Sequence, residues 1–297
     1  MHPGVISAYD LVMRRSDEHA AGLALGDTRQ AAQDTPALER TTGAGRVRIS
    51  ERGVAELHQQ GALRLKPTRG GVQTEIVAIN TAGGLTGGDR LDLAMRLDTN
   101  AAATFTTTAC KKIYRSAGGE ATVSTTIHIA PGARLDWLPQ PMILFDRARI
   151  RRSLALDIAG DASLLAVEGV ILGRTAMGEE LRSGSVHDAW RVCRDGVLVY
   201  ADAFRAEGDV RRGLAGRAAI GDARAFATAL YVAPDAEARI GTVRDGLQAC
   251  AGETGASAWN GLLAVRFLAA DGGALIADLG RFLSAFRGAP LPRSWSC

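Results

Sequence analysis

The chain of 297 residues carries 35 Lys and Arg against 32 Asp and Glu, which gives a formal net charge of only +3. Hydrophobic residues make up 46% of it and charged residues 23%, so the composition excludes a fibrous or largely disordered chain. The basic residues form no long cluster, and the sequence therefore predicts no nucleic-acid partner. At this length the chain can bury a substantial core, as one large domain or two modest ones.

The cysteines and the N-terminal residues bear on the compartment. The four cysteines lie far apart in the sequence, at Cys110, Cys193, Cys250 and Cys297. Because none belongs to a C-x-x-C pair and no His lies at ligand spacing, we predict free thiols in a reducing compartment, not a zinc site or a disulfide framework. Polar residues follow Arg14-Arg15 where a signal peptide would be apolar, and no uncharged apolar run reaches the ~18 residues that span a bilayer. We expect a cytoplasmic protein without a membrane partner.

The N-terminal arm differs from the rest of the chain. Residues 1–42 mix Ala, Asp, Gln, Arg and Thr without a sustained period, and we expect them to be disordered or to order only against a partner. No long linker and no repeat of roughly 20 to 50 residues divides the chain beyond this arm. Residues 43–297 are therefore predicted to form a single domain.

Alternation of apolar and polar residues predicts β-strands through most of that domain. The clearest case is 90–98, where Leu and Met alternate with Arg, Asp and Ala. A hairpin is predicted around Asp195-Gly196, a dipeptide typical of tight β-turns, between strands at 190–193 and 197–200. Further strands are expected near 47–49, 63–65, 72–79, 101–109, 123–129, 133–138, 150–158, 164–172 and 262–269.

Helical spacing appears only near the C-terminus. It predicts helices over about 235–249 and 273–287, the second with a strong apolar face. The expected fold is mainly β: a single domain of stacked, largely antiparallel short strands, β-helix-like or sandwich-like, with two helices in its C-terminal half.

Two glycine pairs stand between predicted strands in the segment 80–89, Asn-Thr-Ala-Gly-Gly-Leu-Thr-Gly-Gly-Asp. Successive glycine amides can surround a phosphate. However, no Lys-Ser/Thr follows as in a P-loop, and the next segment is a predicted strand, so no helix dipole assists. The sequence favours a structural loop that needs glycine for close packing, with a nucleotide site as the alternative.

The sequence contains none of the local motifs that mark common catalytic sites: no G-x-S-x-G, no H-E-x-x-H and no D-x-D-x-D loop. The run Ser185-Val186-His187-Asp188 has the residue types of a catalytic triad. Triad partners are assembled by the fold and not by adjacency in sequence, so this run is weak support for a hydrolase. The sequence itself therefore shows no evident reaction.

Several dense segments resemble one known family, in the same order and from about residue 46 to the C-terminus. They are 80–89, 107–115 (Thr-Thr-Ala-Cys-Lys-Lys-Ile-Tyr-Arg), 135–145 (Leu-Asp-Trp-Leu-Pro-Gln-Pro-Met-Ile-Leu-Phe), 168–179 and 291–295 (Leu-Pro-Arg-Ser-Trp). Together they resemble the urease accessory protein family UreD, called UreH in some bacteria. The segments Trp-Leu-Pro-Gln-Pro and Gly-Arg-x-Ala-x-Gly-Glu look specific to that family. The N-terminal arm does not align, and Asn80-Thr81-Ala82 stands where many relatives have His-Pro-Pro, so no ligand role is carried over to that position.

The resemblance implies a protein that is not itself an enzyme. It implies a scaffold that joins the accessory proteins UreF and UreG to apo-urease and assists nickel delivery to the urease active site. It implies no tightly bound cofactor, nickel only in transit, and no small-molecule substrate. Two other classes stay open: a β-rich module that binds a small ligand or carbohydrate, and a hydrolase whose turnover would depend on Ser185 and His187.

Nickel transit also agrees with the chemistry of the candidate ligands. Ni²⁺ binds imidazole and thiolate strongly, so a chain that must release the ion does better with scattered oxygen ligands. The candidates in the family-like segments are Asp89, Glu168 and Glu179. Glu168 interrupts an apolar strand, where a carboxylate must be paired or hydrated. Two interpretations are open: Glu168 pairs with Arg174 or another cation inside the fold, or these carboxylates line a water-filled passage for the ion.

Overall fold

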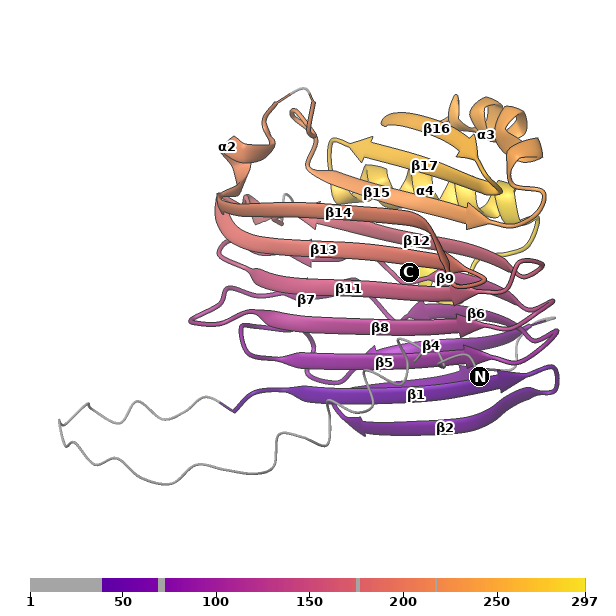
Figure 1. Ribbon diagram of the computed structural model, residues 1–297. Coiled ribbons are helices and arrows are strands. Elements are labelled where there is room, and N and C mark those ends of the chain that lie inside the picture. The colour runs from indigo at the N-terminus through magenta and orange to yellow at the C-terminus, as the bar shows by residue number, and fades with distance from the viewer. Residues whose placement is uncertain (1–38, 69–72, 175–176, 217, 297) are drawn as a thin grey trace. The chain divides into compact units, whose positions relative to one another are not determined.

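The computed structural model describes residues 39–68, 73–174, 177–216 and 218–296. Most of the arm predicted over 1–42 lies outside these residues, so its expected disorder stays a prediction; the first strand begins at Thr42. From Arg40 onward the described residues form one compact unit. Its strands stack as successive levels, from β1 and β2 at one end to β15, β16 and β17 at the other (Figure 1).

Two β-sheets make up this unit. Sheet A has the strand order β14 (Val197–Asp209), β13 (Ser183–Arg194), β11 (Arg149–Ile158), β8 (Ala121–Ile129), β5 (Arg90–Leu97), β1 (Thr42–Ser50), β2 (Gly53–Gly61). Sheet B has the order β16 (Glu253–Trp259), β17 (Leu262–Ala269), β15 (Ala225–Val232), β12 (Ser163–Leu172), β9 (Arg134–Leu138), β6 (Ala102–Thr107), β4 (Thr74–Asn80), β3 (Leu63–Thr68). Two short strands extend sheet B, with β10 (Met142–Leu144) pairing both β12 and β7 (Lys111–Ile113).

The chain winds between the two sheets, for example from β4 in sheet B to β5 in sheet A and back to β6 in sheet B. Successive strands of the same sheet therefore run in the same direction: β5 pairs parallel with β1 and β8, and β11 with β8 and β13. In sheet B, β6 pairs parallel with β4 and β9, and β9 with β12. This stacked, β-helix-like architecture confirms the predicted fold class.

The predicted direction of strand pairing needs refinement. Antiparallel pairs occur at the ends of the stack, such as β1 with β2, β13 with β14, and β15 with β12 and β17, whereas the centre is parallel. Alternation in the sequence reports that one face of a strand is buried, and it carries no information about the direction of the neighbouring strand. "Largely antiparallel" was therefore too specific.

Burial follows the alternation. In β5 and β8 every second side chain is buried, and these side chains face the inner side of sheet B. The resulting inter-sheet core contains most of the buried apolar side chains. The predicted hairpin is also present: Asp195 and Gly196 both have positive φ, as a tight turn between β13 and β14 requires.

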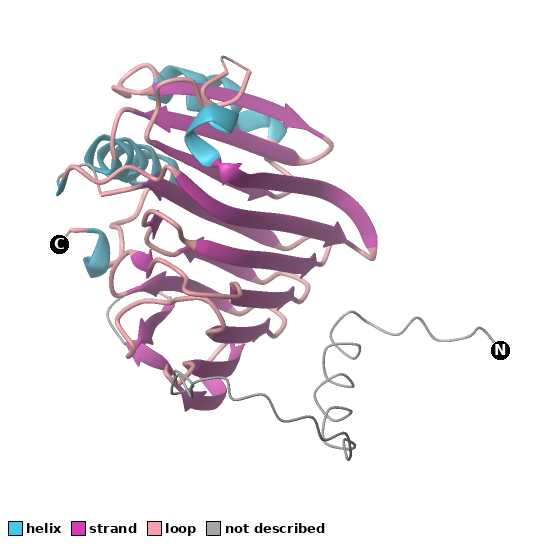
Figure 2. Cartoon of the chain, turned by 90° about the vertical axis from the view of Figure 1, so that its left-hand side faces the viewer, coloured by secondary structure: helices cyan, strands magenta, loops and turns pink. Residues whose placement is uncertain are grey.

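The two longer helices of the described residues pack against sheet B. The predicted helices are observed as α3 (Ile240–Leu247), preceded by a 3₁₀ turn at Glu237–Arg239, and α4 (Gly272–Arg287). Helix α4 begins after Asp271, whose carboxylate accepts the Ala274 amide, and buries its apolar face against β15 and β17 in a second core. In Figure 2 the longer helices, in cyan, lie beside the strands at one end of the stack. A third helix, α2 (Val210–Leu214), is too short for its period to be recognised in the sequence. No helix in the described ranges combines the length and hydropathy needed to cross a bilayer.

Candidate functional site

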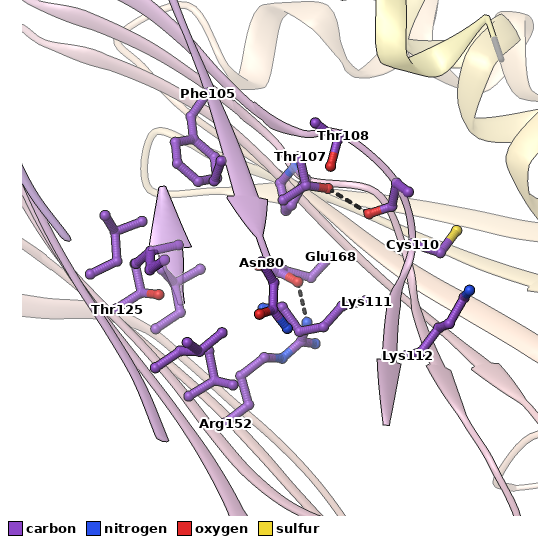
Figure 3. A pocket seen from close by; sticks show the side chains of 18 of the residues that line it. Asn80, Phe105, Thr107, Thr108, Cys110, Lys111, Lys112, Thr125, Arg152 and Glu168 are labelled. Atoms are coloured by element: carbon purple, nitrogen blue, oxygen red, sulfur yellow. Dashed lines mark hydrogen bonds and ion pairs between the residues drawn. The ribbon is translucent and has the colours of Figure 1, made fainter. Parts of the chain in front are cut away.

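Two neighbouring cavities are lined by described residues of both sheets. The first, which we call the glycine-loop chamber, is a cavity of about 330 Å³ bounded by Gly83 and Gly84 of the glycine loop and by inward side chains of β5, β6, β8 and β9. Its walls are mostly apolar, and Lys111, Lys112, Arg152 and Glu168 are its charged residues (Figure 3).

The second cavity, the β14 chamber, is a cavity of about 620 Å³ bounded by β14, β15, β17 and Leu214 of α2. Asp188 and Asp202 line it, and Asp202 forms an ion pair of 2.7 Å with Arg266 of β17. Glu168 lines both chambers. The two cavities are therefore neighbours, with the Glu168 side chain in the wall between them.

That wall is a buried cluster of charges, the Arg152 partition, made of Arg152, Glu168 and Asp188. Each of the three is less than a tenth exposed. Arg152 and Asp188 stand opposite each other on β11 and β13 of sheet A, and Glu168 comes from β12 of sheet B. The cluster therefore ties the two sheets together through charged side chains.

Arg152 is the centre of the partition. Its Nε donates to Asp188 Oδ1 over 2.9 Å, and Nη2 donates to Asp188 Oδ2 in a bidentate arrangement. Its Nη1 donates to Glu168 Oε2. Burial alone would lower the pKa of Arg152, but the two carboxylates outweigh it and hold that pKa above its usual value. The guanidinium stays charged and fixed by three charge-assisted hydrogen bonds.

Glu168 is also held from its other side. Trp137 Nε1 donates to Glu168 Oε1 over 2.9 Å. The indole is stacked on Phe105, with ring centroids 4.0 Å apart and an angle of 9° between the planes. Each carboxylate oxygen therefore has one partner and keeps a lone pair available.

Lys111 brings a second cation to the partition. It lies on β7, and its side chain approaches Glu168 and Arg152 (Figure 3). Burial lowers the pKa of Lys111 to about 8, although the negative charges of Glu168 and Asp188 oppose the shift. Among the interactions of the described residues, none is a hydrogen bond or ion pair of the Lys111 ammonium.

The structure does not bring the three predicted metal ligands together. Asp89 closes the glycine loop: its Oδ1 accepts the Thr41 amide at 2.8 Å and its Oδ2 the Thr86 amide at 2.7 Å. Glu179 forms an ion pair of 2.5 Å with Arg174. Glu168 alone of the three lines the chambers. Within the described ranges no three His, Cys, Asp or Glu side chains gather closely enough to hold a metal ion.

The glycine loop packs as a structural loop would. A Cβ on Gly84 would lie 2.2 Å from the Tyr114 ring, and a Cβ on Gly87 would lie 2.0 Å from Ser116 Oγ and 2.2 Å from the Gly118 carbonyl oxygen. Leu85 between them is fully buried. Glycine is needed at these two positions because β7 and the turn after it approach so closely.

The triad-like run does not form a triad. Ser185 Oγ donates to Glu120 Oε1 over 2.8 Å, whereas the partner of His187 Nε2 is Glu207 Oε1 at 2.7 Å. Asp188 points to the opposite face of β13, toward Arg152. Ser185, His187 and Asp188 therefore do not hydrogen-bond to one another as the members of a catalytic triad would.

Three residues of the site were not recognised in the sequence as functional: Trp137, Arg152 and Lys111. Asp188 was considered only as part of the triad-like run. For Arg152 a clue was present, because it occupies an inward position between Ile150 and Leu154 of an alternating strand. A charged residue in the apolar register predicts a buried partner. The identity of that partner depends on which strands of the two sheets face each other.

Comparison with known proteins identifies the family. The family model described as UreD urease accessory protein matches residues 41–296. The chain belongs to the UreD family. The urease accessory protein UreD of Xanthobacter autotrophicus is 47% identical over 258 residues, 85% of this chain and 89% of that protein. UreD of Azorhizobium caulinodans is 44% identical over 267 residues, 88% of this chain and 98% of that protein. UreD 2 of Methylorubrum populi is 46% identical over 272 residues, with 88% and 92% covered. The resemblance seen in the sequence is thereby confirmed.

Proposed function

We propose that this chain is a non-catalytic urease maturation scaffold that joins UreF and UreG to apo-urease and assists delivery of nickel. The proposal is supported by membership of the UreD family and by relatives that are named urease accessory proteins. It involves no tightly bound cofactor and no small-molecule substrate, and it places the work in the cytoplasm.

The geometry that supports nickel transit is the pair of chambers with Glu168 in their common wall. Together the chambers extend from the glycine loop to β14 and α2. Glu168 keeps a free lone pair on each oxygen, and the described residues contain no group of three His, Cys, Asp or Glu side chains that could hold a metal ion, so this carboxylate would bind a divalent ion weakly enough to release it. The ion would cross from one chamber to the other beside this carboxylate.

Glu168→Gln tests the transit role. Glutamine keeps an oxygen that can accept from Trp137 but removes the charge that attracts a cation. Glu179→Gln is the matched control, because Glu179 loses the same charge in the same family-like segment without lining a chamber. Each variant is co-expressed with urease, UreF and UreG, and nickel per urease active site is measured alongside recovery of the complex.

Reduced nickel loading in Glu168→Gln, with the complex intact and Glu179→Gln normal, is the expected result. Normal loading in Glu168→Gln would refute transit past this residue. Loss of the complex in Glu168→Gln would instead assign Glu168 to holding the sheets together through Arg152.

A small-ligand module is the second candidate, and the glycine-loop chamber is the observation that favours it. Its volume of about 330 Å³ and mostly apolar walls fall within the range of ligand pockets. A pull-down with the full-length chain separates the two proposals: recovery of urease subunits supports the scaffold, whereas their absence favours the ligand module.

A further inference from the structure

The charges around Glu168 balance. Arg152 and Lys111 supply two positive charges, and Glu168 and Asp188 supply two negative ones. All four lie in or beside the wall between the chambers. A neutral cluster gives a divalent cation little net attraction, so one of the two resident cations must yield before Glu168 can hold the ion.

The two resident cations are held very differently. Arg152 donates three hydrogen bonds to the carboxylates and is fixed on β11 between β8 and β13. Lys111 reaches the cluster on a flexible four-carbon stem, and the interactions of the described residues include no hydrogen bond from its ammonium. Moving Lys111 therefore breaks no hydrogen bond of the partition, whereas moving Arg152 breaks three.

The position of Lys111 also suits exchange. It lines the glycine-loop chamber, where there is space beside the cluster into which the ammonium can withdraw. The neighbouring Lys112 lies on the same short strand and also lines this chamber, but its side chain is exposed and its ammonium extends away from the cluster (Figure 3). The two lysines thus form a natural pair of test and control residues.

We propose that Lys111 is the exchangeable counter-ion of Glu168, which a divalent cation displaces on entry and which returns to expel that cation. The inference rests on the proposed nickel transit and adds the reason why the ion would not stay. While the ion is beside Glu168 the ammonium is repelled into the chamber. Its return restores the neutral cluster and lowers the affinity for the ion.

The direct test is the affinity of the full-length chain for free Ni²⁺, measured by equilibrium dialysis. Lys111→Met keeps the apolar stem and removes the charge, which leaves the cluster with one excess negative charge. We expect the affinity for Ni²⁺ to rise by about tenfold or more, as removing a nearby like charge does. Lys111→Gln should give the same rise, which guards against a folding defect specific to one variant.

Three further variants make the test specific. Lys112→Met should leave the affinity at the wild-type value, and Lys111→Arg should also keep it weak because the positive charge remains. The double variant Lys111→Met/Glu168→Gln should lose the gain, since the charge excess is gone. An unchanged affinity in both Lys111→Met and Lys111→Gln would overturn the inference, as would a gain that survives in the double variant.

Nickel loading of urease separates this inference from the proposed function. If Glu168→Gln loads urease normally, transit past Glu168 is wrong, and with it the exchange that depends on it. If Glu168→Gln reduces loading but neither Lys111 variant binds Ni²⁺ more tightly, the transit stands and only the role of Lys111 fails. Where the inference holds, Lys111→Met retains Ni²⁺ on the accessory complex and slows loading.

Discussion

Replacing Arg152 by methionine should destabilise the protein severely. Methionine approximates the length and volume of the side chain but leaves Glu168 and Asp188 facing each other across the sheets without their shared cation. Removing one partner from a buried ion pair costs about 3–5 kcal/mol in the free energy of unfolding, because the remaining charge is left uncompensated. Here three charge-assisted hydrogen bonds are lost, and all three residues are less than a tenth exposed.

The same reasoning predicts that neutralising the three charges of the partition together recovers stability. In the variant Arg152→Met/Glu168→Gln/Asp188→Asn the guanidinium and both carboxylates are removed, and of the four charges around Glu168 only the Lys111 ammonium remains, so most of the loss should be recovered. For a domain of this size 1 kcal/mol changes Tm by roughly 2–4 °C, so Arg152→Met should lower Tm by on the order of 10 °C. The triple variant should melt within a few degrees of the wild type.

Thermal unfolding followed by circular dichroism and urea unfolding followed by Trp fluorescence measure both variants. Arg151→Met is the control, because Arg151 is the exposed neighbour on the same strand and its ion pair with Glu120 lies at the surface. A loss below about 1 kcal/mol in Arg152→Met would refute the reasoning, since that is the scale of a surface pair. So would a triple variant as unstable as the single one.

Three other predictions concern Lys111, the glycine loop and the partner protein. The pKa of Lys111 is about 8 in the folded chain against an ordinary value of 10.5, so between these two pH values the unfolded state binds more protons than the folded state. The stability of the wild type relative to Lys111→Met should therefore rise from pH 8 to pH 10.5 and be independent of pH below pH 8. Urea unfolding of both proteins at each pH measures this difference. Gly87→Ala should lower the free energy of unfolding by about 1–3 kcal/mol, because its Cβ would meet Ser116 Oγ and the Gly118 carbonyl oxygen. Gly118→Ala is the control and should change stability little, because its Cβ would meet nothing within 4 Å. Equal midpoints of urea unfolding for the two variants would contradict the packing argument. Gel filtration should show the full-length chain in a complex with UreF, and a monodisperse chain that elutes unchanged when UreF is added would end the scaffold proposal.

Sequence alternation was sufficient to locate the strands of the parallel centre. The inward Leu91, Leu93 and Met95 of β5 follow the expected period, as do the inward residues of β8 and β11. Alternation failed to locate strands whose burial does not alternate or whose side chains are small. Both faces of the edge strand β2 are largely exposed, so its sequence shows no apolar alternation. Strands β15 and β16 are rich in Ala, and this composition does not distinguish a strand from a loop.

The site was less accessible to sequence reasoning than the fold. A cation partner for Glu168 was one of the two interpretations, and the structure supplies one, but it is Arg152 and not Arg174. Arg174 is closer in sequence, whereas Arg152 lies on the facing sheet, and only the winding of the chain brings β11 opposite β12. The roles of Asp188 and Trp137 were missed for the same reason, since each contact joins residues more than 30 positions apart.

The winding of the chain between two sheets also limits where the protein can change length. One residue inserted near the start of β11 would bring Arg151 inward in place of Arg152 and turn Leu154 and Leu156 toward solvent, because side chains alternate with a period of two. An insertion in an exposed turn that no other segment packs against costs mainly the slowly growing entropy of loop closure. Insertions and deletions among relatives should therefore collect at the strand ends, and the length of β11 should be preserved as strictly as the charge of the arginine it carries inside.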